Sequence, residues 1–290
     1  MEINQGQTDQ EKIQYAARWV REAPAILITA GAGMGVDSGL PDFRGPQGWW
    51  TTFPKFARMN MNFYTLASPR AFDLHPKLAW EFYAIRLNEY RKVVPHQGFH
   101  ILRRWGEQAP KGCRVFTSNV DGEFQKAGFD PSKVLECHGS LHHLQCATPC
   151  CDDIWSADVF QPEFDPQDGS LQTALPTCPH CGGLARPHVL LFNDNAWIDE
   201  PAELGRALLR GWADFYRRQL LVIELGAGKV IPTVRRLGER HAHRFIRINT
   251  NEAGVMTKHG WMGIAGGALD ILTRIDEELK QICEHSQNPN

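Results

Sequence analysis

The sequence contains no apolar run of bilayer length, and its 290 residues carry a net charge of only −2. A membrane-spanning helix needs about 20 consecutive apolar residues, so we expect no membrane insertion. The nearly balanced charge gives no general attraction for nucleic acid. The first twelve residues, MEINQGQTDQEK, have neither the apolar core of a secretory leader nor an Arg-rich import pattern, so we expect a cytoplasmic protein.

Internal repeats and low-complexity linkers are also absent, and 42% apolar residues are enough for a full core. A capping box at Thr8 and Glu11 predicts that a helix begins near residue 9. Further helices are predicted over residues 232–239 and 263–285. The apolar runs that predict buried strands or extended segments are 25–29, 113–119, 133–139, 188–194, 219–226 and 244–249. The alternation of strands and helices predicts an α/β fold with a doubly wound parallel sheet.

Polar and glycine residues follow four of the predicted strands. In doubly wound sheets ligands bind outside the carboxyl ends of the strands, so these residues outline one nucleotide crevice. Glycine and asparagine are also ordinary turn formers, which is the alternative for any single turn. The residues concerned are Gly31–Gly33, Ser118, Asn119 and Asp121, Gly226 and Gly228, and Asn249 and Asn251.

The glycine-rich turn differs from that of ordinary dehydrogenases. GAGMGV does not fit G-x-G-x-x-G, because Gly35 comes one residue early. The acidic residue expected about twenty positions later to hold the ribose is also missing, since Gly48, Trp49 and Trp50 stand there. The turn alone is therefore weak evidence for a dinucleotide.

Five of the eight cysteines lie between residues 146 and 181. A chain of this length does not need disulfides to fold, and clustered cysteine pairs favour a metal site. Cys178 and Cys181 form one half of a zinc site, and Cys146 with either Cys150 or Cys151 forms the other, with Cys150 preferred because Pro149 precedes it. Four thiolates leave no open position, so one structural Zn²⁺ per chain is predicted; free thiols are the alternative.

The segment GAGMGVDSGLPDFRG resembles the signature loop of the sirtuins, the NAD-dependent protein deacylases. TSNVDGEFQKAGF, ECHGSL, CPHCGGLARPHVLLFND, ELGAGKVIP and IRINTNE resemble later motifs of that family, in the same order. The resemblance implies a single catalytic domain over 1–290 with a Rossmann-like NAD-binding part and a smaller helical and zinc-binding lobe. Its expected boundaries are 9–50, 96–138 and 196–283 for the large part, and 51–95 (helical) and 139–195 (zinc ribbon) for the lobe.

The resemblance also implies the activity. NAD is consumed to remove acyl groups from protein lysine side chains, with release of nicotinamide and O-acyl-ADP-ribose. His138 matches the family's base, and an imidazole with a pKa near 6.5 can accept a proton at pH 7. Asn119 is the second expected catalytic residue. A protein ADP-ribosyltransferase or NAD glycohydrolase on the same fold is the alternative function, and a zinc-ribbon interaction module without catalysis is a third.

Cofactor and substrate residues follow from the same motifs. The glycine turn lets the backbone approach the pyrophosphate, and the PDFRG loop closes over the nicotinamide ribose. Val189 and Phe192 are expected in the acyl-lysine tunnel, beside an edge to which the substrate peptide adds as a strand. The residues expected to bind NAD are Gly31, Ala32, Gly33, Asp42, Phe43, Arg44, Trp50, Ser118, Asn119, Val120, Asp121, Gly226, Ala227, Gly228, Asn249, Thr250, Asn251 and Ala265.

Tyr83 and Arg86 resemble the Tyr-x-x-Arg pair of class III sirtuins, which holds the carboxylate of succinyl- or malonyl-lysine. Helical spacing of three places the two side chains on one face. An arginine fork binds a carboxylate through two hydrogen bonds, and a tyrosine hydroxyl adds a third donor. The alternative is a solvated arginine on an amphipathic helix that also carries Glu81, Asn88 and Glu89.

The chain departs from the family pattern at several motif positions, which marks a divergent branch. The departures are Ala30, Gly35, Ser118, the Gly-Ala-Gly at 226–228, and the Phe-Asn-Asp at 192–194.

Overall fold

The protein is described by a computed structural model that covers residues 7–41, 54–59, 61–256 and 260–287. Its larger sheet is parallel and has the order β3-β2-β1-β7-β8-β9. Counted along the chain within this sheet, the order is 3-2-1-4-5-6, that of dinucleotide-binding folds, and it reverses between β1 and β7. The strands are β1 (Ala25–Ala30), β2 (Cys113–Thr117), β3 (Val134–Glu136), β7 (Leu220–Leu225), β8 (Arg244–Asn249) and β9 (Met262–Ala265).

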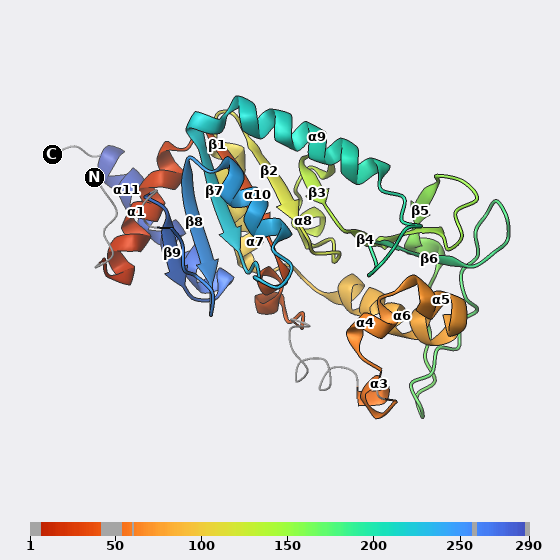
Figure 1. The fold of residues 1–290 in the computed structure, drawn as a ribbon. Coiled ribbons are helices and arrows are strands. Elements are labelled where there is room, and N and C mark those ends of the chain that lie inside the picture. Colours follow the sequence, from red (N-terminus) through yellow and green to blue (C-terminus); the bar gives the residue numbers. More distant parts are fainter. Residues whose placement is uncertain (1–6, 42–53, 60, 257–259, 288–290) are drawn as a thin grey trace.

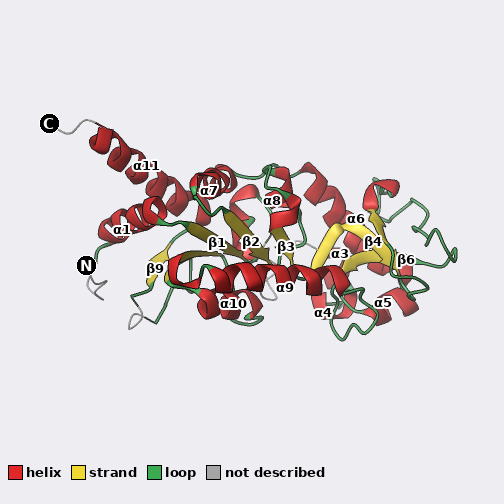
Figure 2. Ribbon diagram, turned by 90° about the horizontal axis from the view of Figure 1, so that it is seen from above, coloured by secondary structure: helices red, strands yellow, loops and turns green. Residues whose placement is uncertain are grey.

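Helices cover both faces of this sheet, as Figures 1 and 2 show. One face packs against α1 (Asp9–Glu22), α7 (Gln97–Gln108), α8 (Glu123–Lys126) and α11 (Ala268–Gln287). The other packs against α9 (Glu200–Phe215) and α10 (Thr233–His241). Strands β1 and β7 are buried along their whole length, because each has a layer of helices on either side.

A second, antiparallel sheet has the order β5-β4-β6, with β5 (Ile154–Ser156), β4 (Gly139–Cys146) and β6 (Ala185–Val189). It shares one apolar cluster with α6 (Pro76–Lys92) and the short helices before it. This confirms the predicted smaller helical and cysteine-bearing lobe; its exact boundaries stay predictions. The remaining elements are α3 (Pro54–Arg58), α4 (Phe63–Leu66), α5 (Pro69–Leu74), and the 3-10 helices η1 (Ala32–Met34), η2 (Val36–Ser38), η3 (Pro131–Lys133), η4 (Ala157–Val159) and η5 (Arg217–Gln219).

The capping box is confirmed, since Glu11 N–H donates to Thr8 Oγ1 at 3.3 Å and Thr8 N–H donates to Glu11 Oε2 at 2.7 Å. The prediction of one helix over 263–285 is wrong at its start. Residues Met262–Ala265 form β9, because Met262 and Ile264 are buried where this segment pairs with β8. Helix α11 begins only after Gly266 and Gly267.

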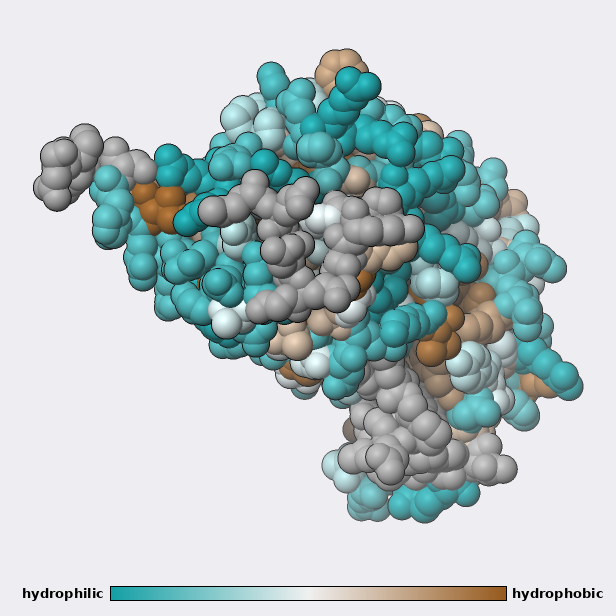
Figure 3. All heavy atoms as spheres, turned by 60° about the vertical axis from the view of Figure 1, so that its left-hand side comes forward, coloured by the Kyte–Doolittle hydropathy of each residue, from teal (hydrophilic) through white to brown (hydrophobic). Residues whose placement is uncertain are grey.

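Among the described residues, no helix is long and apolar enough to cross a membrane. On the face seen in Figure 3, hydrophilic residues cover most of the surface and apolar residues occur in small groups.

Candidate cofactor crevice and zinc site

The carboxyl ends of β1 and β7 meet where the strand order reverses. Gly31 N–H donates to the Leu225 carbonyl at 2.9 Å, and Gly33 N–H donates to the Gly226 carbonyl at 3.1 Å. The two predicted glycine turns are therefore bonded to each other at the position where doubly wound folds bind nucleotides.

The glycines of these turns are required by the contact between them. A Cβ on Gly31 would lie 2.9 Å from Ala227 Cα, and a Cβ on Gly33 would lie 2.7 Å from Gly226 Cα. Gly226 also has a φ of +57°, in the left-handed region that favours glycine. Loop packing alone thus explains these residues, and an approach of the backbone to a pyrophosphate stays a prediction.

Asn249 and Arg235 hold the β7 turn from the side. Asn249 Nδ2 donates to the Ala227 carbonyl at 3.0 Å, and Arg235 donates to the same carbonyl through Nε at 3.1 Å and Nη2 at 2.8 Å. Asn249 Oδ1 accepts from the Asn251 and Glu252 N–H groups at 3.1 and 3.0 Å. The turn is therefore fixed before any ligand binds.

The remaining predicted cofactor residues at this edge lie around the same turns. Ala265 ends β9 beside Asn249. Ala32, Gly33 and Gly228 are half-buried, and Thr250, Asn251 and Ala265 are exposed.

Ser118 and Asn119 continue β2 toward the β1 turn. Ser118 N–H donates to the Ala30 carbonyl at 3.1 Å. Asn119 is 9% exposed, and its Nδ2 donates to the Gly31 carbonyl at 3.2 Å. The predicted catalytic amide therefore lies directly at the glycine turn.

Asp121 and Glu123 place two carboxyl groups in the interior beside this edge. Burial, together with the neighbouring Asp121 carboxylate, raises the pKa of Glu123 to about 8. Burial also raises the pKa of Asp121. A Cβ on Gly35 would lie 2.9 Å from Glu123 Oε2, so the unusual glycine at 35 leaves room for this carboxyl group.

His138 lies between the two sheets. The preceding Cys137 N–H donates to the Thr117 carbonyl of β2, and the His138 carbonyl accepts from Leu190 N–H after β6, both at 2.9 Å. Burial lowers the pKa of the imidazole, while a hydrogen bond to the Ser118 backbone raises it. The net shift is downward, so the ring is neutral at pH 7 and can act as a base.

Tyr83 and Arg86 lie together inside the smaller lobe. Their exposures are 1% and 6%, so the alternative of a solvated arginine is wrong. Arg86 Nη2 donates to Tyr90 Oη at 2.6 Å, and its guanidinium carbon lies 5.8 Å from the Tyr83 ring centroid. Burial raises the pKa of Asp121, and the positive charge of Arg86 partly offsets this rise. Arg86 therefore lies near the polar residues that follow β2.

Val189 and Phe192 flank the same region. Val189 is 7% exposed and belongs to the apolar cluster that also contains Tyr83 and Val120. The Phe192 ring lies 4.7 Å from that of Tyr64, centroid to centroid. Val189 therefore lies in the cluster that reaches Val120 after β2, whereas Phe192 packs against α4. That the two line an acyl-lysine tunnel stays a prediction.

Four cysteines converge at one end of the antiparallel sheet. The sulfur atoms of Cys146, Cys150, Cys178 and Cys181 all lie within 4.8 Å of one another. Two pairs are closer, at 3.7 Å for Cys146–Cys181 and 3.6 Å for Cys150–Cys178. A tetrahedral zinc with Zn–S bonds of about 2.3 Å separates its sulfurs by about 3.8 Å. The four residues fit a structural zinc, and Cys151 does not belong to this set.

The predicted residues of the closing loop, Asp42, Phe43, Arg44 and Trp50, lie outside the described part of the chain.

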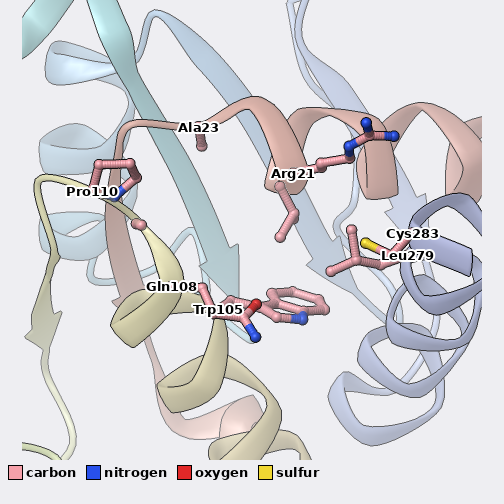
Figure 4. A pocket seen from close by; sticks show the side chains of 9 residues that line it. Arg21, Ala23, Trp105, Gln108, Pro110, Leu279 and Cys283 are labelled. Atoms are coloured by element: carbon pink, nitrogen blue, oxygen red, sulfur yellow. The ribbon is translucent and has the colours of Figure 1, made fainter. Parts of the chain in front are cut away.

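A cavity of about 130 Å³ lies elsewhere, between α1, α7 and α11 (Figure 4). Most of its lining comes from residues that precede β1 and β2, and the rest from α11, so it lies near the amino ends of these two strands. The cofactor crevice is at their carboxyl ends. The lining residues are Val20, Arg21, Ala23, Trp105, Gln108, Ala109, Pro110, Leu279 and Cys283.

One buried ion pair in the smaller lobe could not be predicted from the sequence. Arg186 and Asp194 are 1% and 0% exposed in their side chains, and they form two hydrogen bonds of 2.7 and 3.0 Å. Asp194 also accepts from the Leu191 and Ala196 N–H groups, both at 3.1 Å. This carboxylate therefore fixes the loop that carries Phe192.

The sequence profile of the Sir2 family matches residues 31–209. The chain is 29% identical to the NAD-dependent protein deacylase of Aquifex aeolicus over 88% of this chain and 95% of that protein. It is 31% identical to the NAD-dependent protein deacylase of Aeropyrum pernix, over 77% and 78% of the two chains. A solved Sir2 homologue–NAD complex has the same fold, with a TM-score of 0.73, 22% identity, and coverage of 97% of this chain and 98% of the other. Together with the order of the strands and the place of the glycine turns, these matches show that the chain belongs to the Sir2 family, the sirtuins.

Proposed function

We propose that this chain removes acyl groups from protein lysine side chains with NAD as co-substrate, and that it accepts succinyl and malonyl groups at least as well as acetyl. The deacylase activity of its relatives and the position of Asn119 and His138 at one sheet edge support the first part. The observation that carries the second part is the burial of Arg86 beside Tyr83.

The residues that would hold NAD are those of the two glycine turns, together with Asn119, Asp121 and Asn249. Bound NAD supplies an electrophilic ribose carbon that the acyl oxygen can attack. One ring nitrogen of His138 is hydrogen-bonded to the Ser118 backbone, so the other nitrogen is the one that would accept the proton. Because burial lowers the pKa of this ring, the accepting form is populated at neutral pH.

The proposed preference for succinyl and malonyl groups follows from the burial of the positive charge of Arg86. An arginine that is 6% exposed has little water around it, so a carboxylate that reaches it forms a strong charge-assisted hydrogen bond. Such a bond contributes roughly 1.5–3 kcal/mol, about a ten- to a hundred-fold preference. An acetyl group has no carboxylate and does not gain this contact.

The substrate peptide is proposed to bind along β6. This strand lies at an edge of the antiparallel sheet, since its described neighbour is β4 alone. Main-chain hydrogen bonds to an added strand depend little on side chains, so we expect weak sequence specificity. A cytoplasmic location also stays a prediction.

The test is a panel of acetyl-, malonyl- and succinyl-lysine peptides, each with and without NAD. We expect NAD-dependent release of all three groups and O-acyl-ADP-ribose as product. Mass spectrometry of the product separates this activity from the alternatives, because an NAD glycohydrolase yields ADP-ribose and a transferase yields ADP-ribosylated protein.

Arg86→Met tests the acyl preference. It is expected to raise KM for the acidic acyl peptides about ten- to a hundred-fold and to leave acetyl turnover nearly unchanged. Lys92→Met is the matched control, because it removes an exposed positive charge from the same helix. Equal losses on acetyl and succinyl peptides in Arg86→Met would show that the pair is only structural.

A further inference from the structure

A second group of ligand-type side chains lies beside the four-cysteine cluster. Cys151, Asp153 and His180 offer a sulfur, a carboxylate oxygen and a ring nitrogen that all lie within 4.8 Å of one another. His180 Nε2 lies 2.5 Å from Asp153 Oδ2. None of the three residues has a role in the cofactor crevice or the four-cysteine site.

The fold of the zinc lobe brings these residues together. Cys151 directly follows Cys150, and His180 lies between Cys178 and Cys181 in the chain. Asp153 immediately precedes β5, which pairs with β4. Each donor is thus tied closely to an element that is already fixed, so little further conformational entropy is lost when the three bind one ion.

The donor set matches one class of metal. A thiolate, an imidazole and a carboxylate are the three ligand types that bind Zn²⁺ in proteins, and sites with three protein ligands leave the fourth position open. A thiolate ligand disfavours Mg²⁺ and Ca²⁺, which prefer oxygen. The Asp153 and His180 side chains are 62% and 51% exposed, so the fourth position faces solvent.

The surrounding charge favours a cation. Residues 146–184 contain six Asp or Glu residues and no Lys or Arg. A zinc ion held by four thiolates adds two further negative charges. A His–Asp ion pair would explain two members of the group, and the contact of Cys151 Sγ with Cys150 Sγ at 3.8 Å would explain the third. One bound ion explains all three together.

We propose that Cys151, Asp153 and His180 bind a second zinc ion, at the surface and with one position open to water. Because it has three protein ligands instead of four, this ion exchanges more readily than the structural one. The site is independent of the proposed deacylase activity.

The test is the zinc content of the whole protein after equilibration with micromolar free zinc, measured by elemental analysis and by native mass spectrometry. We expect about two zinc ions per chain for the wild type and about one for His180→Asn and Cys151→Ser. Asp152→Asn is the matched control, since it removes a neighbouring acid outside the group and should keep both ions. The unfolding temperature reports separately on the structural site.

Three results would overturn the proposal. The wild type could hold one zinc under the same conditions, or His180→Asn could still hold two. Cys151→Ser could also lose all zinc together with stability, which would make Cys151 a ligand of the structural ion instead.

Discussion

The Arg186–Asp194 ion pair allows a sharp test of what holds the loop that carries Phe192 in the smaller lobe. Asp194→Ala leaves the Arg186 guanidinium at 1% exposure without its carboxylate, and it removes the acceptor of the Leu191 and Ala196 N–H groups. An uncompensated buried charge costs about 3–5 kcal/mol. The loop that carries Phe192 loses its anchor at the same time.

The assay is urea unfolding at a fixed zinc concentration. We expect Asp194→Ala to lower the free energy of unfolding by about 3–5 kcal/mol. Glu203→Ala is the control, because the Glu203 side chain is 64% exposed in its pair with Arg206 and such pairs contribute about 0–1 kcal/mol. The double variant Arg186→Met, Asp194→Leu should recover much of the loss, since an apolar pair leaves no buried charge.

A loss below about 1 kcal/mol in Asp194→Ala would refute this reasoning, because water or another acceptor would then have replaced the carboxylate. A double variant as unstable as Asp194→Ala would show that the loop hydrogen bonds matter more than the charge.

Three further predictions follow from the crevice and the zinc site. His138→Ala should lower the rate of deacylation about a hundred- to ten-thousand-fold while NAD still binds, and a variant that retains a tenth of the wild-type rate would contradict the proposed role. Because burial lowers the pKa of this base, the kcat/KM of the wild type should fall as the pH decreases through a pKa below 6.5. Cys178→Ala should lose zinc and stability together, as elemental analysis and thermal unfolding would show, and retention of both would contradict the site. Glu123→Gln should flatten the pH dependence of stability. The pKa of Glu123 in the folded protein is raised from 4.5 to about 8, so the free energy of unfolding of the wild type should fall by roughly 3–5 kcal/mol as the pH rises between these two values. Equal losses in both proteins would show that Glu123 ionises freely.

The central strands could be predicted from the sequence because they are covered on both faces. Residues 25–29 and 219–226 are continuous apolar runs, and both form buried strands with bounds within one residue of the prediction. Met262–Ala265 could not be assigned in the same way. It is short, it lies directly before α11, and only its pairing with β8 makes it a strand.

Part of the zinc site could also be predicted from the sequence, and part could not. The C-x2-C spacing of Cys178 and Cys181 was enough to predict half of the zinc site. The choice between Cys150 and Cys151 depended on which sulfur lies close to the other three, which only the folded chain shows. The burial of Arg186, Asp194 and Glu123 could not be predicted, because a charged residue is expected at the surface unless long-range packing buries it.

The contact between the two glycine turns limits which substitutions this sequence can accept during evolution. A side chain on Gly31 or Gly33 collides with the β7 turn, and Gly226 is held in a left-handed conformation, so each substitution is penalised by the fold whether or not a ligand ever binds. A descendant that lost all catalysis would still be selected to keep these three glycines in order to fold. The glycine motif is therefore a marker of ancestry and folding, and a search for inactive members of the family should look instead at positions proposed for the chemistry, such as His138.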